Sequence, residues 1–204
     1  MQLRPYQQEA KDSIFQEWEK GIRKTLLVLP TGCGKTIVFA KVTEQCVQNG
    51  DRVLILAHRG ELLQQAADKI AKSTGLNCAT EKAEESCLGS WFRITVGSVQ
   101  SLMRESRLNR FPQDYFDTII IDEAHHCISD SYKRVLQHFP ESKVLGVTAT
   151  PDRGDMKNLA VYLKVLHMST HCPKPLRGIF ISELKQYDSV KSGSDRSRGS
   201  VRGF

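Results

Sequence analysis

An apolar run that ends in two adjacent carboxylates limits the possible folds of this chain more than any other feature. Residues 119–121 are all isoleucine, and Asp122 and Glu123 follow them directly. A run of this kind is typical of a strand that is buried on both faces of a parallel sheet. Earlier in the chain, a turn with the sequence Pro-Thr-Gly-Cys-Gly-Lys-Thr at residues 30–36 follows another short apolar run. Short segments like either of these also occur by chance in unrelated sequences. Together they indicate a phosphate cradle and a carboxylate pair in one domain.

Apolar periodicity predicts that strands and helices alternate along the chain. We expect strands at 25–29, 52–57, 92–96, 118–122 and 143–148, helices at 4–20, 35–48 and 60–73, a short helix from Ser98, and one more helix before the last strand. Most of these strands lack an alternation of polar and apolar residues, which favours a parallel sheet with helices on both faces. The predicted fold class is therefore α/β. In such sheets ligands bind beyond the carboxyl ends of the strands, where Thr31, Asp122 and Thr148 fall.

The size and charge of the chain give only general bounds. Its 204 residues, 40% of them apolar, are enough for the core of one domain. The net charge of +6 invites a nucleic-acid interpretation. However, residues 164–204 hold 8 Lys/Arg against 3 Asp/Glu, whereas residues 1–163 hold 21 against 20. The basic character belongs to the C-terminal segment, so the case for nucleic acid has to rest on motifs.

Membrane and metal signals are weak in this sequence. There is no apolar run of about 18 residues and no signal-peptide pattern at the N-terminus, so we expect a cytoplasmic protein without a membrane partner. The six cysteines are scattered and form no C-x-x-C pair, which indicates reduced thiols. His167, His171 and Cys172 lie close together, but no second ligand pair accompanies them. The only metal we expect is magnesium.

The turn at residues 30–36 has the composition of a phosphate-binding loop. Glycine allows positive φ angles and a close approach, so that successive backbone N–H groups point at phosphate oxygens, and the next helix adds its dipole. Lys35 would reach the β and γ phosphates, and the Thr36 hydroxyl would ligate Mg2+. The generic pattern has glycine where this chain has Leu29, and a glycine-rich turn without a ligand is the alternative interpretation. The residues expected to bind nucleotide in this loop are Thr31, Gly32, Cys33, Gly34, Lys35 and Thr36.

The two carboxylates differ in their expected roles because they differ in position. Asp122 ends the strand and can hold the Mg2+ ion together with Thr36. Glu123 can align the attacking water and accept its proton. A solvated strand end followed by a helix cap is the alternative interpretation, and the presence of the phosphate-binding loop makes it the weaker one.

The loop and the carboxylate pair resemble motifs I and II of superfamily 2 helicases. Residues 122–126, Asp-Glu-Ala-His-His, are similar to the D-E-A-H-H subgroup related to restriction-type and repair translocases. The resemblance covers about residues 3–153 and implies a RecA-like P-loop NTPase lobe that uses ATP and Mg2+. It also implies ATP-dependent unwinding of, or translocation on, nucleic acid, with DNA favoured by the subgroup. The catalytic set that it implies is Lys35, Asp122, Glu123 and His125.

Shorter segments resemble further motifs of this family and occur in the family's order. Residues 4–7, Arg-Pro-Tyr-Gln, resemble the element that reads adenine, in which the Gln7 amide can make two hydrogen bonds to the base edge. Residues 57–62 and 96–102 resemble motifs Ia and Ib, which contact the backbone of the bound strand, and ordinary strand-to-helix loops are the alternative. The resemblance implies that the nucleotide is bound by Arg4 and Gln7. It implies that nucleic acid is contacted by His58, Arg59, Ser98 and Gln100. It also implies that ATP hydrolysis is coupled to strand binding by Thr148 and Thr150.

The segment after the resemblance needs a separate interpretation. We expect residues 1–162 to form the ATP-binding lobe and residues 163–204 to form a basic tail, with no candidate for the family's second lobe. In related translocases, a particular peptide sequence follows this point. The codons for residues 163–177 can encode that same peptide when they are read in a frame shifted by two bases. The tail is therefore interpreted as out of frame or disordered, and a genuine basic tail is the alternative.

Two functions of different classes remain open at this point. The first is an ATP-dependent helicase or translocase lobe, weakly active or inactive without a second lobe. The second is a non-catalytic fragment that binds nucleic acid through its basic tail, independently of ATP.

Overall fold

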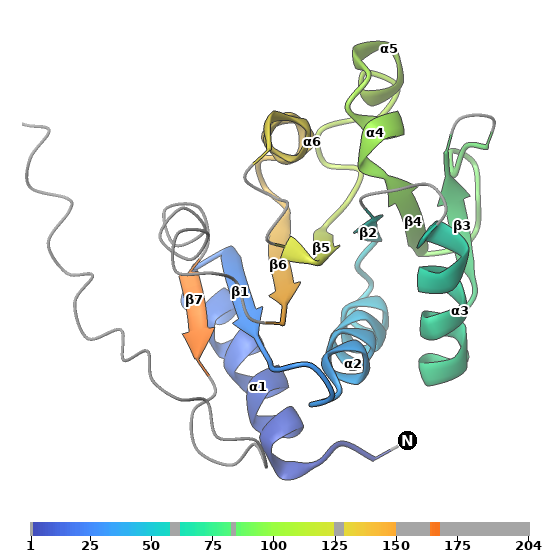
Figure 1. Ribbon diagram of the computed structural model, residues 1–204. Helices are drawn as coiled ribbons and strands as arrows, with labels where there is room; N and C mark the ends of the chain where they lie inside the picture. The colour runs from blue at the N-terminus through green and yellow to red at the C-terminus, as the bar shows by residue number, and fades with distance from the viewer. Residues whose placement is uncertain (1, 58–61, 83–84, 125–128, 150–163, 168–204) are drawn as a thin grey trace, which may run out of the picture. The chain divides into compact units, whose positions relative to one another are not determined.

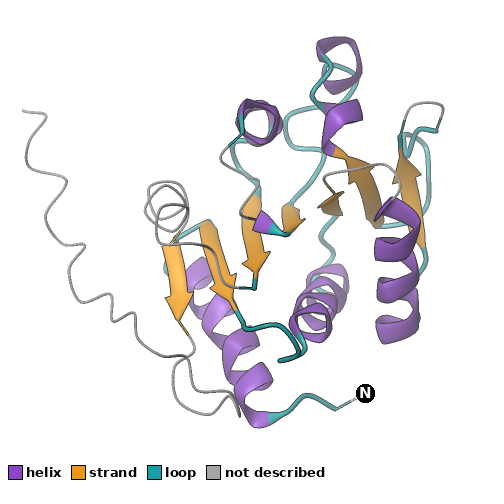
Figure 2. Ribbon diagram, in the orientation of Figure 1, coloured by secondary structure: helices purple, strands orange, loops and turns teal. Residues whose placement is uncertain are grey.

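The computed structural model describes residues 2–57, 62–82, 85–124, 129–149 and 164–167. These residues all belong to one compact unit of the chain, Met1–Lys174. Within it, strands and helices alternate (Figures 1 and 2). The strands are β1 (Lys24–Val28), β2 (Val53–Ala57), β3 (Cys78–Glu81), β4 (Ile94–Ser98), β5 (Thr118–Asp122), β6 (Lys143–Thr148) and β7 (Lys164–His167). The helices are α1 (Pro5–Glu19), α2 (Lys35–Gln48), α3 (Leu62–Thr74), α4 (Val99–Leu102), α5 (Glu105–Leu108) and α6 (Asp130–His138).

The strands form one parallel sheet in the order β3-β4-β2-β5-β6-β1-β7. Every pairing between neighbouring strands is parallel. All strand ends that lead into the predicted site therefore lie on one edge, which we call the carboxyl edge, as the arrows of Figure 1 show. The prediction of an α/β fold with a parallel sheet is confirmed.

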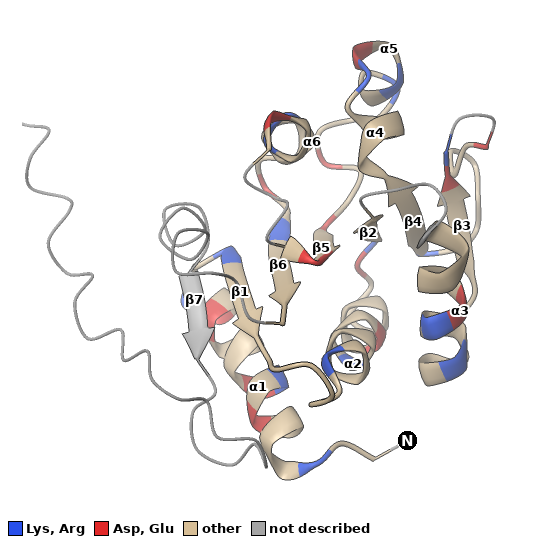
Figure 3. Cartoon of the chain, viewed as in Figure 1, with Lys and Arg blue, Asp and Glu red and all other residues tan. Residues whose placement is uncertain are grey.

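Each central strand is buried on both of its faces. Leu27 of β1 and Ile55 of β2 pack with α1, α2 and α3, whereas Leu26 and Leu54, one residue earlier, pack with α4, α5 and α6. Successive residues of a strand therefore face two different apolar layers, one on each side of the sheet. Because both sets of side chains must be apolar, the strands show no alternation of polar and apolar residues. The charged residues lie mainly on the helices and loops (Figure 3).

Some elements differ from the sequence-based expectation. The predicted strand at 92–96 lies two residues later, because pairing with β2 begins at Ile94. Strand β3 and the short helix α5 were not expected. The four residues of β7 fall inside the predicted basic tail and pair with β1. The rest of that tail lies outside the described residues, and the boundary at residue 162 stays a prediction.

Polar side chains tie the loops together at the opposite edge of the sheet, where the strands begin. The Asp51 carboxylate accepts hydrogen bonds from the Lys143 ammonium at 2.7 Å and from the Thr118 hydroxyl at 2.8 Å. Asp117 accepts the backbone N–H of Arg52 at 2.7 Å. These contacts, which we call the amino-edge ties, fix the starts of β2, β5 and β6 relative to one another.

Gly97 of β4 lies where two packed strands and α4 leave no room for a side chain. A Cβ atom at this position would approach the Cδ1 atoms of Leu102 and Leu54 to 2.8 Å and 3.2 Å. We therefore expect Gly97→Ala to lower the free energy of unfolding by about 1–3 kcal/mol, as overpacked cores do. Urea denaturation of the purified chain measures this value. Adding Leu102→Val should recover part of the loss, and a Gly97→Ala effect below about 0.5 kcal/mol would contradict the packing account.

Candidate active site

The turn between β1 and α2 adopts a conformation that only glycine accepts easily. Gly32 and Gly34 have φ angles of 87° and 77°, in the left-handed region. Gly34 caps α2, and its carbonyl accepts the backbone N–H groups of Ile37 and Val38 at 2.9 and 3.2 Å. The first N–H groups of a helix have no partner within it, so α2 begins with donors directed at the carboxyl edge.

Leu29 lies at the position where the generic phosphate-binding pattern has glycine. Its backbone N–H donates to the Thr148 carbonyl at 3.1 Å, which extends the pairing of β1 with β6 by one residue. Its side chain is fully buried with α1 and α2. The backbone at Leu29 has no positive φ angle, so this position does not require glycine.

The lysine of the loop meets the two carboxylates, which come from residues almost ninety positions later. The Lys35 ammonium lies 2.6 Å from Glu123 Oε1 and 4.0 Å from Asp122 Oδ1. Lys35 is 15% exposed, Asp122 25% and Glu123 46%, so the cation is enclosed and Glu123 faces solvent. Two segments predicted to share one edge of the sheet are therefore in direct contact.

The backbone at Glu123 is unusual. Glu123 has a φ angle of 56°, the only positive φ of a residue other than glycine among the described residues. Such angles are uncommon outside glycine and persist where the surroundings impose them. Here the Glu123 N–H donates to Asp122 Oδ1 at 3.0 Å, and its side chain contacts Lys35. The turn directs both carboxylates of adjacent residues toward one cation.

Asp122 sits in an environment that disfavours its charge. Burial raises the pKa of Asp122 above its ordinary value, and the neighbouring Glu123 charge acts in the same direction. The Lys35 ammonium lowers that pKa and so opposes both effects. A second cation beside Asp122 would stabilise the carboxylate further, which suits a metal ligand.

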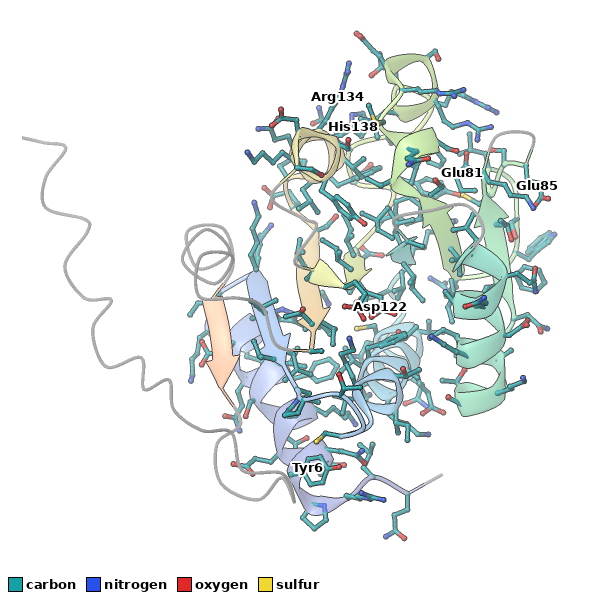
Figure 4. The ribbon with its side chains drawn as sticks, viewed as in Figure 1. Tyr6, Glu81, Glu85, Asp122, Arg134 and His138 are labelled. Carbon is teal, nitrogen blue, oxygen red and sulfur yellow. The ribbon has the colours of Figure 1, made fainter. Side chains whose placement is uncertain are left out.

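The N-terminus of α1 is hydrogen-bonded to the phosphate-binding loop. The Gln7 amide donates to the Cys33 carbonyl at 3.1 Å, and the Tyr6 hydroxyl donates to the same carbonyl at 3.0 Å. Figure 4 labels Tyr6 near the start of α1. Gln7 also accepts the backbone N–H of Arg4 at 3.0 Å. The sequence predicted that Gln7 reads a base, whereas in the structure both ends of its amide bind the chain itself. Tyr6 was missed, because a tyrosine in a helix is usually a core residue.

The thiol of Cys33 also differs from expectation. Cys33 is disulfide-bonded, so the prediction of reduced thiols is wrong at this position. Cys46, Cys78 and Cys87 are free. Burial raises the pKa of the Cys46 thiol to about 12 and those of the other two to about 11, so these three stay protonated at neutral pH.

The remaining predicted site residues fall into two groups. Thr148 pairs with Val28 in the sheet, and Val147 before it pairs with Asp122, so Thr148 lies between the phosphate-binding loop and the carboxylates. Ser98 is 3% exposed, whereas Gln100 is exposed at the start of α4. His58, Arg59, His125 and Thr150 lie outside the described residues.

Two further kinds of feature are absent from the described residues. No group of three or more His, Cys, Asp or Glu residues there has a geometry that suits a metal ion. In the same residues, no helix combines the length and the apolar character that crossing a bilayer requires.

Fold and site together define a class of protein. A parallel sheet, a glycine-rich loop before α2 and a lysine against two strand-end carboxylates are the features of a RecA-like P-loop NTPase lobe of the superfamily 2 helicase type. The chain belongs to the family described as "Type III restriction enzyme, res subunit", which matches residues 1–153.

Relatives of known name agree with this class. The Saccharomyces cerevisiae protein named "Putative ATP-dependent helicase IRC3" is 32% identical in an alignment 209 positions long, which covers 96% of this chain and 30% of the yeast protein. The DNA 3'-5' translocase XPB2 of Sulfurisphaera tokodaii is 32% identical over 158 residues, which cover 78% of this chain and 33% of that protein. The chain thus spans about a third of the length of these relatives.

Solved structures with a similar fold are helicases and related ATPases. The UvsW helicase of bacteriophage T4 gives a TM-score of 0.63 at 18% identity, over 81% of this chain and 60% of that one. The SWI2/SNF2 ATPase core of Sulfolobus solfataricus, in complex with dsDNA, gives 0.62 at 21% identity, over 80% of this chain and 38% of that one. At these identities the likeness concerns the fold.

Proposed function

We propose that this chain is the ATP-binding lobe of a helicase or translocase that acts on DNA. The observation that carries the proposal is the position of the Lys35 ammonium, 2.6 Å from Glu123 and 4.0 Å from Asp122 beside the helix N-terminus of α2. DNA is favoured because a relative is named a DNA translocase and a structure of similar fold holds dsDNA. Other relatives are named RNA helicases, so RNA is the alternative substrate to test.

The loop residues and the carboxylates divide the chemistry between them. The backbone N–H groups of the loop, Thr31 to Thr36, and the Lys35 ammonium bind the phosphates, as in P-loop NTPases. Glu123, which faces solvent, orients the water and accepts its proton. When phosphate takes the place of Glu123 on Lys35, the carboxylate becomes available to that water.

The residues present suit Mg2+ rather than a transition metal. The Thr36 hydroxyl and the Asp122 carboxylate are hard oxygen donors, and Mg2+ usually takes one or two protein carboxylates and completes its shell with phosphate and water. The ion would neutralise charge on the phosphates. Thr36 and Asp122 would hold the ion. Because Asp122 is largely buried, the ion would have limited contact with solvent on that side.

The other assignments combine the family resemblance with the positions of those residues that the structure describes. Arg4 and Gln7 lie beside the loop and are proposed to recognise the nucleotide base. Thr148, with His125 and Thr150, is proposed to transmit the state of the phosphates to the bound strand. Gln100 is exposed and is proposed to contact nucleic acid with His58 and Arg59. The buried Ser98 would contribute only through its backbone.

Hydrolysis by the 204-residue chain alone is expected to be slow. Helicases of this superfamily place arginines from a second lobe against the γ-phosphate, and such an arginine contributes about 10³–10⁵ in rate. We propose that a second lobe, or a partner that supplies one, completes the site. We also propose a cytoplasmic location.

Binding of ATP with and without Mg2+ tests the proposed function. We expect the 204-residue chain to bind ATP in the presence of Mg2+ and to lose at least about tenfold in affinity when EDTA is added, by isothermal titration calorimetry. Asp122→Asn should remove most of the Mg2+ dependence while leaving binding without metal unchanged. Equal affinities of the wild-type chain with and without Mg2+ would contradict the assignment.

Nucleic-acid binding separates the two candidate functions. The helicase function predicts that ATP changes the affinity for single-stranded DNA, measured by fluorescence anisotropy with an RNA of the same sequence as comparison. If ATP has no effect and deletion of residues 168–204, which keeps β7, abolishes binding, the chain acts instead through its basic tail.

A further inference from the structure

We propose that Tyr6 is a positioning residue that holds the phosphate-binding loop so that Gln7 can leave it and bind the nucleotide base. This inference rests on the proposed ATP-binding function and deepens it. Tyr6 donates no atom to the nucleotide in this scheme, because its hydroxyl acts through the Cys33 carbonyl.

One backbone carbonyl receives both side chains. The Tyr6 hydroxyl and the Gln7 amide donate to the Cys33 oxygen at 3.0 and 3.1 Å. Tyr6, Gln7 and Cys33 are 7%, 3% and 3% exposed, so this carbonyl is largely shielded from water. A carbonyl oxygen has two lone pairs and can accept both bonds at once. Either donor alone is enough to keep this buried carbonyl hydrogen-bonded.

Gln7 is fully engaged within the chain. Its amide nitrogen donates to the Cys33 carbonyl and to the Tyr6 hydroxyl, and its oxygen accepts the backbone N–H of Arg4. A Cβ atom at Gly34 would lie 2.2 Å from the same amide nitrogen, so the side chain is in direct contact with the loop. An amide nitrogen has two N–H donors, and here one faces the Cys33 carbonyl at 3.1 Å and the other the Tyr6 hydroxyl at 3.5 Å. Gln7 must therefore give up at least one of these bonds before its nitrogen can donate to a base edge.

The Tyr6 hydroxyl, as the second donor to the Cys33 carbonyl, lowers the free-energy cost for Gln7 to release that carbonyl. When Gln7 exchanges the Cys33 carbonyl for an acceptor on adenine, the Tyr6 hydroxyl still donates to that carbonyl, so no buried acceptor is left without a donor. The positive φ angles of Gly32 and Gly34 on either side of Cys33 can then persist. Without the Tyr6 hydroxyl, the same exchange leaves a buried acceptor without a donor, which opposes it.

Three ligands distinguish this role from a general structural one. ATP offers the adenine edge, GTP offers a different edge, and inorganic tripolyphosphate has no base. The affinities of the 204-residue chain for each are measured by calorimetry with Mg2+ and a reducing agent, for wild type, Tyr6→Phe, Gln7→Ala and the double variant. Tyr115→Phe, at a tyrosine that contacts Arg52 and Phe111 outside this site, is the matched control.

The expected pattern follows from the shared carbonyl. Tyr6→Phe should weaken ATP binding about three- to tenfold, the usual effect of one hydrogen bond, and should reduce the ATP-to-GTP preference by the same factor. Tripolyphosphate affinity should change less than about twofold in either single variant, because one donor remains on Cys33. In the double variant, tripolyphosphate affinity should fall at least about threefold.

Other outcomes overturn the proposal. Equal weakening of all three ligands by Tyr6→Phe would make Tyr6 a general structural residue, and no weakening of any ligand would remove its role. Unchanged tripolyphosphate affinity in the double variant would show that the carbonyl needs no donor. If wild type binds neither ATP nor tripolyphosphate, the proposed function fails first, and this result is distinct from all of the above.

Discussion

Replacing Lys35 with alanine is expected to abolish measurable ATP binding. The side chain is the only cation found within 4.0 Å of Asp122 and Glu123 in the part of the chain that the structure describes. Its removal takes away about two charge-assisted hydrogen bonds to phosphate and leaves two carboxylates facing the triphosphate. We expect a loss of affinity of at least about 100-fold, measured by calorimetry with Mg2+.

Lys41 provides a matched control for this experiment. It lies on the same helix, α2, and forms an ion pair of the same length, 2.6 Å, with Glu44. Lys41→Ala should leave ATP affinity within about twofold, because an ion pair outside the site contributes little. If Lys35→Ala binds ATP as the control does, Lys35 does not bind phosphate.

The second large effect is expected at Glu123. In a form that also carries a second helicase lobe, Glu123→Gln should lower the rate of ATP hydrolysis by about 10²–10⁴, the usual contribution of a general base. Glutamine has the same size and suits the same backbone, so the turn at φ 56° is kept. ATP affinity should stay the same or rise by no more than about fivefold, because the half-exposed ion pair that holds Lys35 is lost.

Steady-state hydrolysis and equilibrium binding, measured on the same preparation, separate these two effects. Glu44→Gln, which breaks the matched pair on α2, should change neither quantity. A Glu123→Gln protein that hydrolyses ATP at the wild-type rate would exclude Glu123 as the base. A large fall in ATP affinity would instead assign it to nucleotide binding.

The sequence predicts the centre of this fold well, because burial there is decided by unbroken apolar runs. Strands β5 and β6 and helix α2 begin and end where they were predicted. The contact between Lys35 and the carboxylates was also foreseen in outline, since the carboxyl ends of parallel strands share one edge. The parallel direction of the strands followed from the alternation of strands and helices, whereas their order in the sheet was not predicted.

Other features depend on contacts that the sequence pattern does not contain. Strand β3 has only four residues, includes the polar Thr80, and exists because β4 offers an edge to pair with. The bonds of Tyr6 and Gln7 to Cys33, and the left-handed backbone of Glu123, arise only when distant segments meet. Burial of Ser98 follows from its place at the end of a covered strand, which a motif match ignores.

The amino-edge ties have a consequence for engineering this protein. They join Asp51, Thr118 and Lys143 at the end of the sheet opposite Lys35, and a five-residue strand separates the two ends by roughly 17 Å. Free-energy changes at sites this far apart usually add without interacting. Thermodynamic stability and ATPase activity can therefore be changed independently. A chain stabilised by substitutions at the amino-edge ties should stay folded when the site around Lys35 is inactivated.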